Sequence, residues 1–220
     1  MRRLLPILFT LCLCLPAGAQ FVVDTGVRDF VQNDIRKGAP FYDIGFVGRF
    51  VPSTMHMGLG FVGVPTKHAL LDRTIEETIA HACSISATIL LKYTVKRLRP
   101  DGSDTTSLPS GHMSFACVGA ELTRMDYGWG WGGGAYAVAA LVGFERLWGD
   151  KHWLTDVLAG AGIGILSAHV GGWLLEPFKN LFGIPTIEWD GWGTRKSQLA
   201  FSPFIDPFSN SYTASISVVF

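Results

Sequence analysis

Charge is scarce in this sequence, and its two signs cancel. Charged residues make up 16% of the 220 positions, and 18 Lys and Arg balance 18 Asp and Glu, whereas globular domains average ~25% charged residues. A chain with no net basic field is not expected to bind nucleic acid. With 48% hydrophobic residues it is not disordered either, because disorder requires low hydrophobicity and high net charge. The mean hydropathy of +0.29 lies between the values typical of soluble and of membrane proteins.

Cysteine is also rare, and internal repeats and low-complexity linkers are absent. Only Cys83 and Cys117 lie beyond the first segment of the chain. Both fall in apolar stretches of helical character, so we expect buried free thiols, with a disulfide as the alternative.

The N-terminal segment has the pattern of a secretory signal peptide. Two arginines precede an apolar run from Leu4 to Leu15, which at about twelve residues is too short to span a bilayer. The small residues at 17–19 suit cleavage after Ala19. We therefore expect export to a bacterial periplasm, with the mature chain either soluble or associated with a membrane. An uncleaved membrane anchor is the alternative.

The remaining chain reads as mostly helical, with one strand at its end. Apolar periodicity predicts helices over 67–99, 110–125, 135–146 and 152–180, a short helix within 21–40, no element in 41–66 and a break at 128–134. Apolar and polar residues alternate over 212–220, which predicts a terminal strand. The expected fold is all-α, a helical bundle with a short C-terminal β-strand or hairpin. The expected organisation is a signal peptide (1–19), an N-terminal segment (20–66), a catalytic helical domain (67–180) and an aromatic-rich tail (181–220).

One stretch is a borderline membrane span. Residues 157–175 contain a single ionisable side chain, His169, and their length fits either a membrane-spanning helix or the buried central helix of a bundle. The spacing of Gly160 and Gly164 would allow another helix to approach closely.

Three motifs carry the chemistry. The first runs from Lys92 to Arg99 and Pro100. On a helix, Lys92, Lys96 and Arg99 would share one face. Basic residues in a last turn also suit the negative end of a helix dipole, which is the structural alternative.

The second motif is Pro109-Ser110-Gly111-His112. Ser is a good helix N-cap, Gly allows close approach of a ligand, and the free amides of a first helical turn attract anions. His112 adds a titratable group there. An ordinary capped turn is the alternative.

The third motif joins Arg146, His152 and Asp156. At a spacing of four on a helix, the Asp156 carboxylate could accept the Nδ1–H of His152 and leave Nε2 as nucleophile or base. Arg146 suits phosphate oxygens. A metal site that also uses His112 is a weaker alternative, because the nearby cations would oppose it.

Together the motifs supply cations, helix amides and two histidines, which fits a tetrahedral oxyanion and covalent phosphoryl transfer. In this hypothesis His152 attacks phosphorus and His112 protonates the leaving oxygen. Phosphate would be held by Lys92, Arg99, Ser110, Gly111 and Arg146.

The same residues resemble the type 2 phosphatidic acid phosphatase (PAP2) superfamily, which includes bacterial class A acid phosphatases, lipid phosphate phosphatases and vanadium haloperoxidases. The patterns are Lys-x6-Arg-Pro, Pro-Ser-Gly-His and Arg-x5-His-x3-Asp, spread over residues from about 70 to 175. The resemblance implies a helical bundle, a phosphohistidine on His152, and neither metal nor cofactor. Two features depart from the family pattern. Glu145 stands where Ser is usual, which we expect to alter a peripheral contact rather than the phosphate site, and the loop between Pro100 and Pro109 is short.

The site predicts a phosphomonoester or pyrophosphate as substrate. The apolar composition favours an envelope lipid that carries such a phosphate. The resemblance suggests lipid A, undecaprenyl pyrophosphate or phosphatidate-type lipids. Alternatives are a soluble periplasmic acid phosphatase for small phosphomonoesters, a haloperoxidase, and a non-enzymatic envelope protein.

Overall fold

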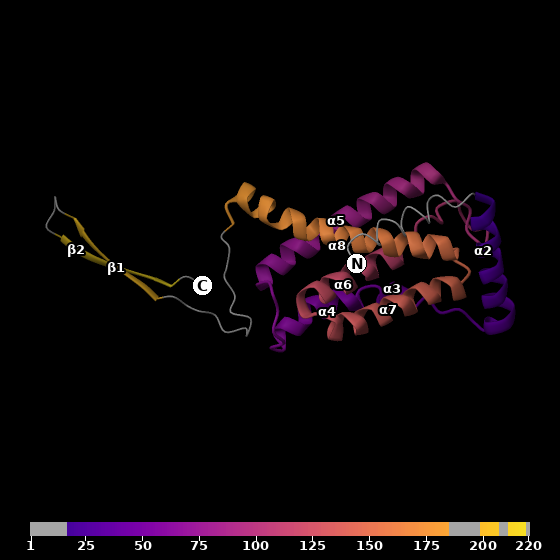
Figure 1. The fold of residues 1–220 in the computed structure, drawn as a ribbon, viewed down its shortest axis with the longest axis horizontal. Coiled ribbons are helices and arrows are strands. Elements are labelled where there is room, and N and C mark those ends of the chain that lie inside the picture. Colours follow the sequence, from indigo (N-terminus) through magenta and orange to yellow (C-terminus); the bar gives the residue numbers. More distant parts are fainter. Residues whose placement is uncertain (1–16, 185–198, 207–210, 219–220) are drawn as a thin grey trace.

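The computed structural model describes residues 17–184, 199–206 and 211–218. Its helical elements are α2 (Ala17–Asp29), the π-helical η1 (Phe30–Arg36), α3 (Gly45–Gly48), α4 (Val51–Phe61), α5 (Leu70–Val95), α6 (Gly111–Tyr127), α7 (Trp129–Trp148) and α8 (Leu154–Phe182). Figure 1 shows α5 to α8 running alongside one another, with the indigo α2 crossing one end of this bundle. The predicted helical bundle is confirmed.

Helix α6 is the centre of the bundle and packs against α4, α5, α7 and α8. Its buried positions are mostly small, which lets neighbouring backbones approach closely. A Cβ added at Gly160 of α8 would lie 2.5 Å from the carbonyl oxygen of Ser110, and one at Gly164 would lie 2.3 Å from that of Ser114. The close helix approach predicted from these glycines is therefore confirmed, and it fixes the start of α6 against α8.

Two sequence predictions about helix boundaries are wrong. The break expected over 128–134 is confined to Gly128, whose φ of +81° ends α6, and α7 begins at the next residue. The glycines of α7 remain helical because tertiary packing overrides their low propensity. A Cβ at Gly132, for example, would lie 2.7 Å from the Cα of Arg124.

The second error concerns 41–66, where no element was expected. This segment holds all of α3 and α4, whose glycines also accommodate neighbours. A Cβ at Gly60 would lie 2.3 Å from a guanidinium nitrogen of Arg73. Glycine here marks close packing rather than a loop.

Large apolar side chains remain exposed on the outside of the bundle. Among the described residues, α8 is the single helix long and apolar enough to cross a membrane by length and composition. Only 39% of its most apolar window is buried within the bundle. Exposed apolar side chains on the neighbouring helices include Ile85, Ile89, Leu90, Leu141 and Phe144. An apolar surface of this extent is unusual for a monomeric soluble protein.

The two ends of the chain are described only in part. Residues 1–16 of the predicted signal peptide lie outside the described residues, and residues 17–19, before the predicted cleavage point, begin α2. Strands β1 (Leu199–Asp206) and β2 (Ser211–Val218) pair antiparallel, with Leu199 opposite Val218. The side chains of these strands lie outside the described part. Cys83 and Cys117 are both free, as expected, but only Cys117 is buried, whereas Cys83 is half-buried.

Candidate active site

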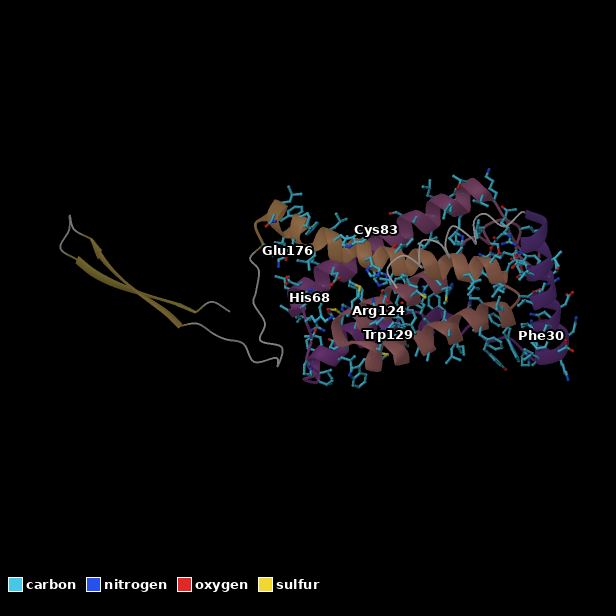
Figure 2. The ribbon with its side chains drawn as sticks, in the orientation of Figure 1. Phe30, His68, Cys83, Arg124, Trp129 and Glu176 are labelled. Atoms are coloured by element: carbon cyan, nitrogen blue, oxygen red, sulfur yellow. The ribbon has the colours of Figure 1, made fainter. Side chains whose placement is uncertain are left out.

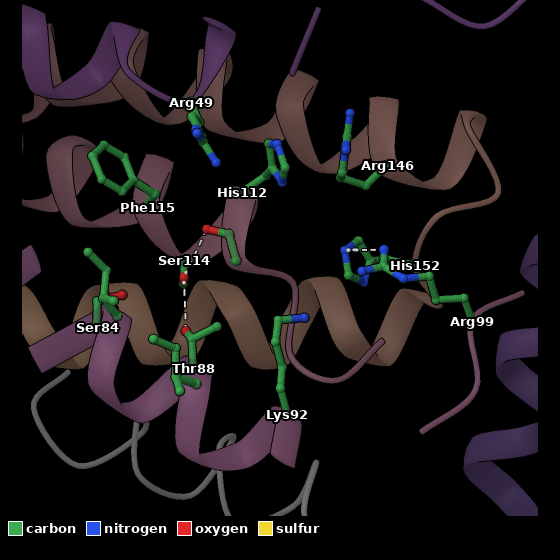
Figure 3. Close-up of a pocket in the computed structure, with 13 residues that line it drawn as sticks. Arg49, Ser84, Thr88, Lys92, Arg99, His112, Ser114, Phe115, Arg146 and His152 are labelled. Carbon is green, nitrogen blue, oxygen red and sulfur yellow. Dashed lines mark hydrogen bonds between the residues drawn. The ribbon is translucent and has the colours of Figure 1, made fainter. Parts of the chain in front are cut away.

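Six of the predicted site residues line one pocket (Figure 3). The cavity has a volume of about 410 Å³ and lies among the second half of α5, the start of α6, the end of α7 and the segment before α8. Arg146, His152 and Arg99 lie together on one side, and Phe115 lies on the other, next to Arg49. The predicted residues in its lining are Lys92, Arg99, Gly111, His112, Arg146 and His152.

The predicted pairing of His152 with Asp156 differs in the structure. Helix α8 begins at Leu154, so His152 lies in a bend before the helix and is not one turn below Asp156. The distance from His152 Nδ1 to Asp156 Oδ2 is 3.8 Å, which is too long for a hydrogen bond. The expected direct hydrogen bond is therefore absent, although the carboxylate remains the nearest negative charge to the ring.

Asp156 has other hydrogen-bond partners, which fix its position. Its carboxylate accepts from Ser107 Oγ at 2.5 Å, from Arg97 Nη1 at 2.7 Å and from the backbone N–H of Trp153 at 3.0 Å. The last of these contacts caps the first turn of α8. The side chain is fully buried, so it provides a fixed negative charge behind His152.

His152 has the protonation state of a nucleophile. Arg99 Nη1 lies 3.4 Å from its Nε2, and a guanidinium can only donate. We infer that Nε2 has a lone pair and that the ring proton is on Nδ1, toward Asp156. Burial is the largest influence on this ring and lowers the pKa of His152, and the charges of Arg99 and Lys92 lower it further. The imidazole is therefore neutral at neutral pH.

The basic face predicted for α5 is not formed. The helix ends at Val95, and Lys96 terminates it with a φ of +49°. Lys96 is exposed, whereas Arg99 reaches the pocket from the following loop. There Arg99 Nε lies 2.9 Å from the carboxylate oxygens of Asp104, and Lys92 Nζ donates to the carbonyl of Thr106. Arg99 and Lys92, which line the pocket, thus also hold the short loop between Pro100 and Pro109 in place.

The first turn of α6 contributes unsatisfied polar groups. Ser110 is the N-cap residue and is fully buried, yet its hydroxyl makes no capping hydrogen bond. Neither Ser110 Oγ nor His112 Nε2 has a hydrogen-bond partner among the described residues. Burial, followed by the charges of Arg146 and Arg49, lowers the pKa of His112 to about 4. Burial and Arg99 likewise lower the pKa of Lys92 to about 8. Such a site favours a bound anion.

Glu145, the departure from the family pattern, does not line the pocket but contacts Arg146, which does. This agrees with the peripheral change expected at this position. Its carboxylate accepts from Arg146 Nε at 2.5 Å and from Nη2 at 2.7 Å. Asp43 accepts from the same Nη2. A Cβ at Gly45 would lie 2.3 Å from Glu145 Oε2, so glycine leaves the space that this carboxylate occupies. Two acids therefore orient Arg146 and offset its charge.

Sequence reasoning missed two arginines. Arg49, between α3 and α4, lines the pocket and lies over the rings of Phe46 and Phe50 at 4.6 and 4.7 Å. Arg97 joins Asp156 to Asp24 of α2, whose carboxylate lies 2.5 Å from Arg97 Nη2. No local pattern marked either residue, because their partners lie far away in the sequence.

Residues 75–176 match the PAP2 superfamily. This stretch, a little under half of the chain, is similar to the PAP2 superfamily. The matched range contains every predicted site residue from Lys92 to Asp156, so the family resemblance drawn from the three motifs is confirmed. Arg49 and Asp43 lie before this range, and Asp24 precedes it in α2.

Among curated proteins, a lipid A 1-phosphatase of Porphyromonas gingivalis is 42% identical over 89 residues. The match covers 39% of this chain and 20% of that relative, so the chain corresponds to about a fifth of the relative's length.

Two solved structures share the fold of this chain. One is LpxE of Aquifex aeolicus, with a TM-score of 0.53 at 17% identity, covering 68% of this chain and 94% of that one. The other is a transmembrane PAP2-type phosphatidylglycerolphosphate phosphatase of Bacillus subtilis, with a TM-score of 0.54 at 20% identity, covering 80% and 94%. The predicted PAP2-type helical architecture is thus confirmed.

Proposed function

We propose that this protein is a phosphatase that hydrolyses a phosphate ester or anhydride through a phosphohistidine on His152. The observation that carries this proposal is the neutral, buried His152, which shares one pocket with His112 and with four cationic side chains. The cations are Arg49, Lys92, Arg99 and Arg146. The match to the PAP2 superfamily and the lipid A 1-phosphatase relative support the same reaction class.

In the first step, His152 Nε2 attacks phosphorus and the bond from phosphorus to the leaving oxygen breaks. That oxygen takes a proton from His112 and departs as an alcohol or as a phosphate. In the second step, water attacks the phosphohistidine, releases inorganic phosphate and regenerates His152. The four cations and the amides at the start of α6 balance the charge on the three remaining phosphoryl oxygens.

His112 acquires its proton only when the phosphate is present. In the free site its pKa is about 4, partly because of the charges of Arg146 and Arg49. A bound phosphate anion offsets those charges and raises the pKa of His112, which makes it an acid at the time the leaving group needs one. Asp156 stabilises the positive charge that develops on His152 during attack.

We propose that this chemistry needs no metal. A metal site built from His112, His152 and Asp156 would require the Asp156 carboxylate as a ligand, and its oxygens already accept from Ser107, Arg97 and a backbone amide. Four cations around the same pocket would also repel a metal ion. Activity should survive chelation, and vanadate should inhibit as a mimic of the five-coordinate phosphoryl group.

We further propose that the substrate is a lipid phosphate met at a membrane surface. The exposed residues Ile85 and Ile89 line the same pocket as His152, so apolar surface extends from the site to the outside of α5. Helix α8 begins directly beyond His152 and has the length and apolar composition of a membrane span. A span there would hold the pocket at the level of lipid headgroups.

The competing proposal is a soluble periplasmic phosphatase for small phosphomonoesters, and rates separate the two. A lipid enzyme gains binding energy from acyl chains, so kcat/KM should fall well beyond tenfold when lipid A or phosphatidate is replaced by a short-chain analogue or p-nitrophenyl phosphate. Comparable rates on all substrates, together with release from membranes by carbonate, would overturn the lipid proposal and leave the phosphatase proposal intact. His169→Ala, outside the pocket, is the matched control for His152→Ala.

We propose periplasmic export with cleavage after Ala19. Such cleavage would keep Asp24, whose carboxylate accepts from the backbone N–H and hydroxyl of Thr155 at 2.9 and 2.6 Å. The mature N-terminal helix would then still support the segment around Asp156. Mass spectrometry of the native protein should find Gln20 at the N-terminus, whereas an intact Met1 would indicate a retained anchor.

A further inference from the structure

A second cluster of titratable side chains lies at the other end of the bundle. It joins His68, just before α5, with Glu76 in the first turns of α5 and Asp126 in the last turn of α6. Glu76 and Lys92 lie on the same helix, which at 1.5 Å per residue separates them by about 24 Å. Figure 2 shows His68 near Glu176, at the end of the bundle opposite Phe30. The cluster is therefore distinct from the pocket around His152.

The three side chains offer ligand atoms that converge. His68 Nδ1 lies 2.6 Å from Asp126 Oδ1 and 3.8 Å from Glu76 Oε2, and the three ligand atoms all lie within 4.8 Å of one another. Glu76 and Asp126 are buried, whereas the His68 side chain is 37% exposed. Two fixed carboxylates thus lie beneath one imidazole that borders solvent.

Within this cluster of three, Glu76 has a buried side-chain oxygen without a hydrogen-bond partner in the described part of the chain. This oxygen is Oε1, and the side chain is 1% exposed. An unpaired buried carboxylate is costly. A Cβ at Gly172 would lie 2.9 Å from this oxygen, so a glycine of α8 leaves the space in which the carboxylate lies.

The nearby cations have other partners. Lys179 pairs with Asp72 at 3.0 Å, and Arg73 donates to the carbonyl of His56 and the hydroxyl of Tyr127. Neither pairs with Glu76 among the described residues. The ion-pair contact that Glu76 does make runs from Oε2 to His68 Nδ1 at 3.8 Å, and a positive ligand from outside the chain would bind this oxygen more closely.

A fourth residue holds the cluster in shape. His56 is fully buried and bridges two carboxylates, with Nε2 3.0 Å from Asp126 Oδ2 and Nδ1 2.9 Å from Glu77 Oε2. This contact occupies one oxygen of Asp126 and leaves the other directed at His68. Outer contacts of this kind orient ligands in metal sites.

We propose that His68 Nδ1 and the carboxylates of Glu76 and Asp126 bind a divalent transition metal, with zinc the best match. Imidazole nitrogens and carboxylate oxygens are both zinc ligands, and three protein ligands leave a fourth position for water. Ligand atoms about 2.0–2.2 Å from a tetrahedral zinc lie about 3.3–3.6 Å apart. The observed separations of 2.6 and 3.8 Å lie on either side of that spacing. The metal would replace the proton between His68 and Asp126.

Such a metal would stabilise the fold and take no part in the chemistry. It would tie the loop before α5 to the end of α6, and through His56 it would also engage α4. Its position far from His152 means that its loss should lower thermal stability without abolishing phosphoryl transfer. The metal proposal and the phosphatase proposal can therefore fail independently.

The test uses the purified full chain, stripped with a chelator and titrated with zinc against a chromophoric competitor. We expect one zinc per chain and a rise in Tm on binding. His68→Asn keeps a donor toward Asp126 but removes the imidazole ligand, and Glu76→Gln removes a carboxylate. Each should weaken zinc binding by at least about 100-fold, the upper range for loss of outer-shell contacts, and should abolish the rise in Tm.

His169→Ala is the matched control. This histidine is also partly exposed and also contacts a buried glutamate, Glu121, at 2.9 Å, and its loss should leave zinc binding unchanged. If Glu76→Gln fails to fold, His68→Asn decides the outcome, because its side chain borders solvent. Equal zinc affinity in His68→Asn and His169→Ala, or no saturable zinc binding by the wild type, would overturn the proposal.

Discussion

Replacing Asp156 by Asn tests how a carboxylate that makes no hydrogen bond to His152 can still act on it. Attack on phosphorus puts positive charge on the imidazole, and Asp156 Oδ2 lies 3.8 Å from Nδ1. At an effective dielectric constant of ~20, opposite unit charges at this distance attract by about 4 kcal/mol. Since each 1.36 kcal/mol is tenfold in rate, the neutral amide should lower kcat by up to about three orders of magnitude.

Asp24→Asn is the matched control for this substitution. Arg97 lies between the two acids, 2.7 Å from Asp156 Oδ1 and 2.5 Å from Asp24 Oδ2, and both acids are buried. Each variant removes one charged partner of Arg97 and leaves the other, so each should cost about 1.5–3 kcal/mol of stability, the range for hydrogen bonds to charged groups. Only Asp156 also lies next to His152.

The assay is phosphate release below the Tm of both variants, with thermal unfolding measured in parallel. We expect similar losses of Tm, a fall in kcat of about 10²–10³-fold for Asp156→Asn, and a fall of less than about tenfold for Asp24→Asn. Equal falls in kcat would refute the reasoning, because Asp156 would then act only by holding Arg97 and the loop.

The remaining predictions concern protonation and metal independence. Arg49→Gln removes a charge that depresses the pKa of His112, so this pKa should rise, and the alkaline limb of the kcat/KM profile should move to higher pH. An unmoved limb would mean that His112 is not the acid. Above pH 8, Lys92 loses its charge, since its pKa is about 8, and KM should rise in the wild type. A constant KM would remove Lys92 from phosphate binding. EDTA should leave the initial rate intact and vanadate should inhibit, whereas activity abolished by EDTA and restored by zinc would give His112 and His152 roles as ligands.

Local motifs predicted much of the pocket because their geometry is local. The start of a helix is set by local sequence and does not depend on how that helix packs. The motif at Ser110, Gly111 and His112 therefore predicted the free amides that α6 brings to the site. The glycines of α8 predicted close packing because a helix face without Cβ atoms allows a neighbouring helix to approach closely. The helical class followed from apolar periodicity in α5 and α6.

The failures arise where tertiary contacts override local patterns. The Asp156 assignment assumed a helix that already included His152, but α8 begins two residues later and uses Asp156 for its own first turn. Arg49 lies among glycines and aromatics that predict no helix, and it reaches the pocket only through packing. A peripheral contact was expected at Glu145, but its partner Arg146 required the side-chain geometry, because adjacent residues on a helix do not ordinarily face each other.

The most direct measurement is an acid-free quench of the enzyme during turnover of a substrate labelled with radioactive phosphate, followed by peptide mapping. The account predicts label that is stable to alkali and labile to acid, located on the peptide that contains His152. The label should be lost in His152→Ala and retained in His169→Ala. Label on the peptide that contains His112, or no labelled protein while wild-type enzyme turns over, would contradict the central claim that His152 is the nucleophile.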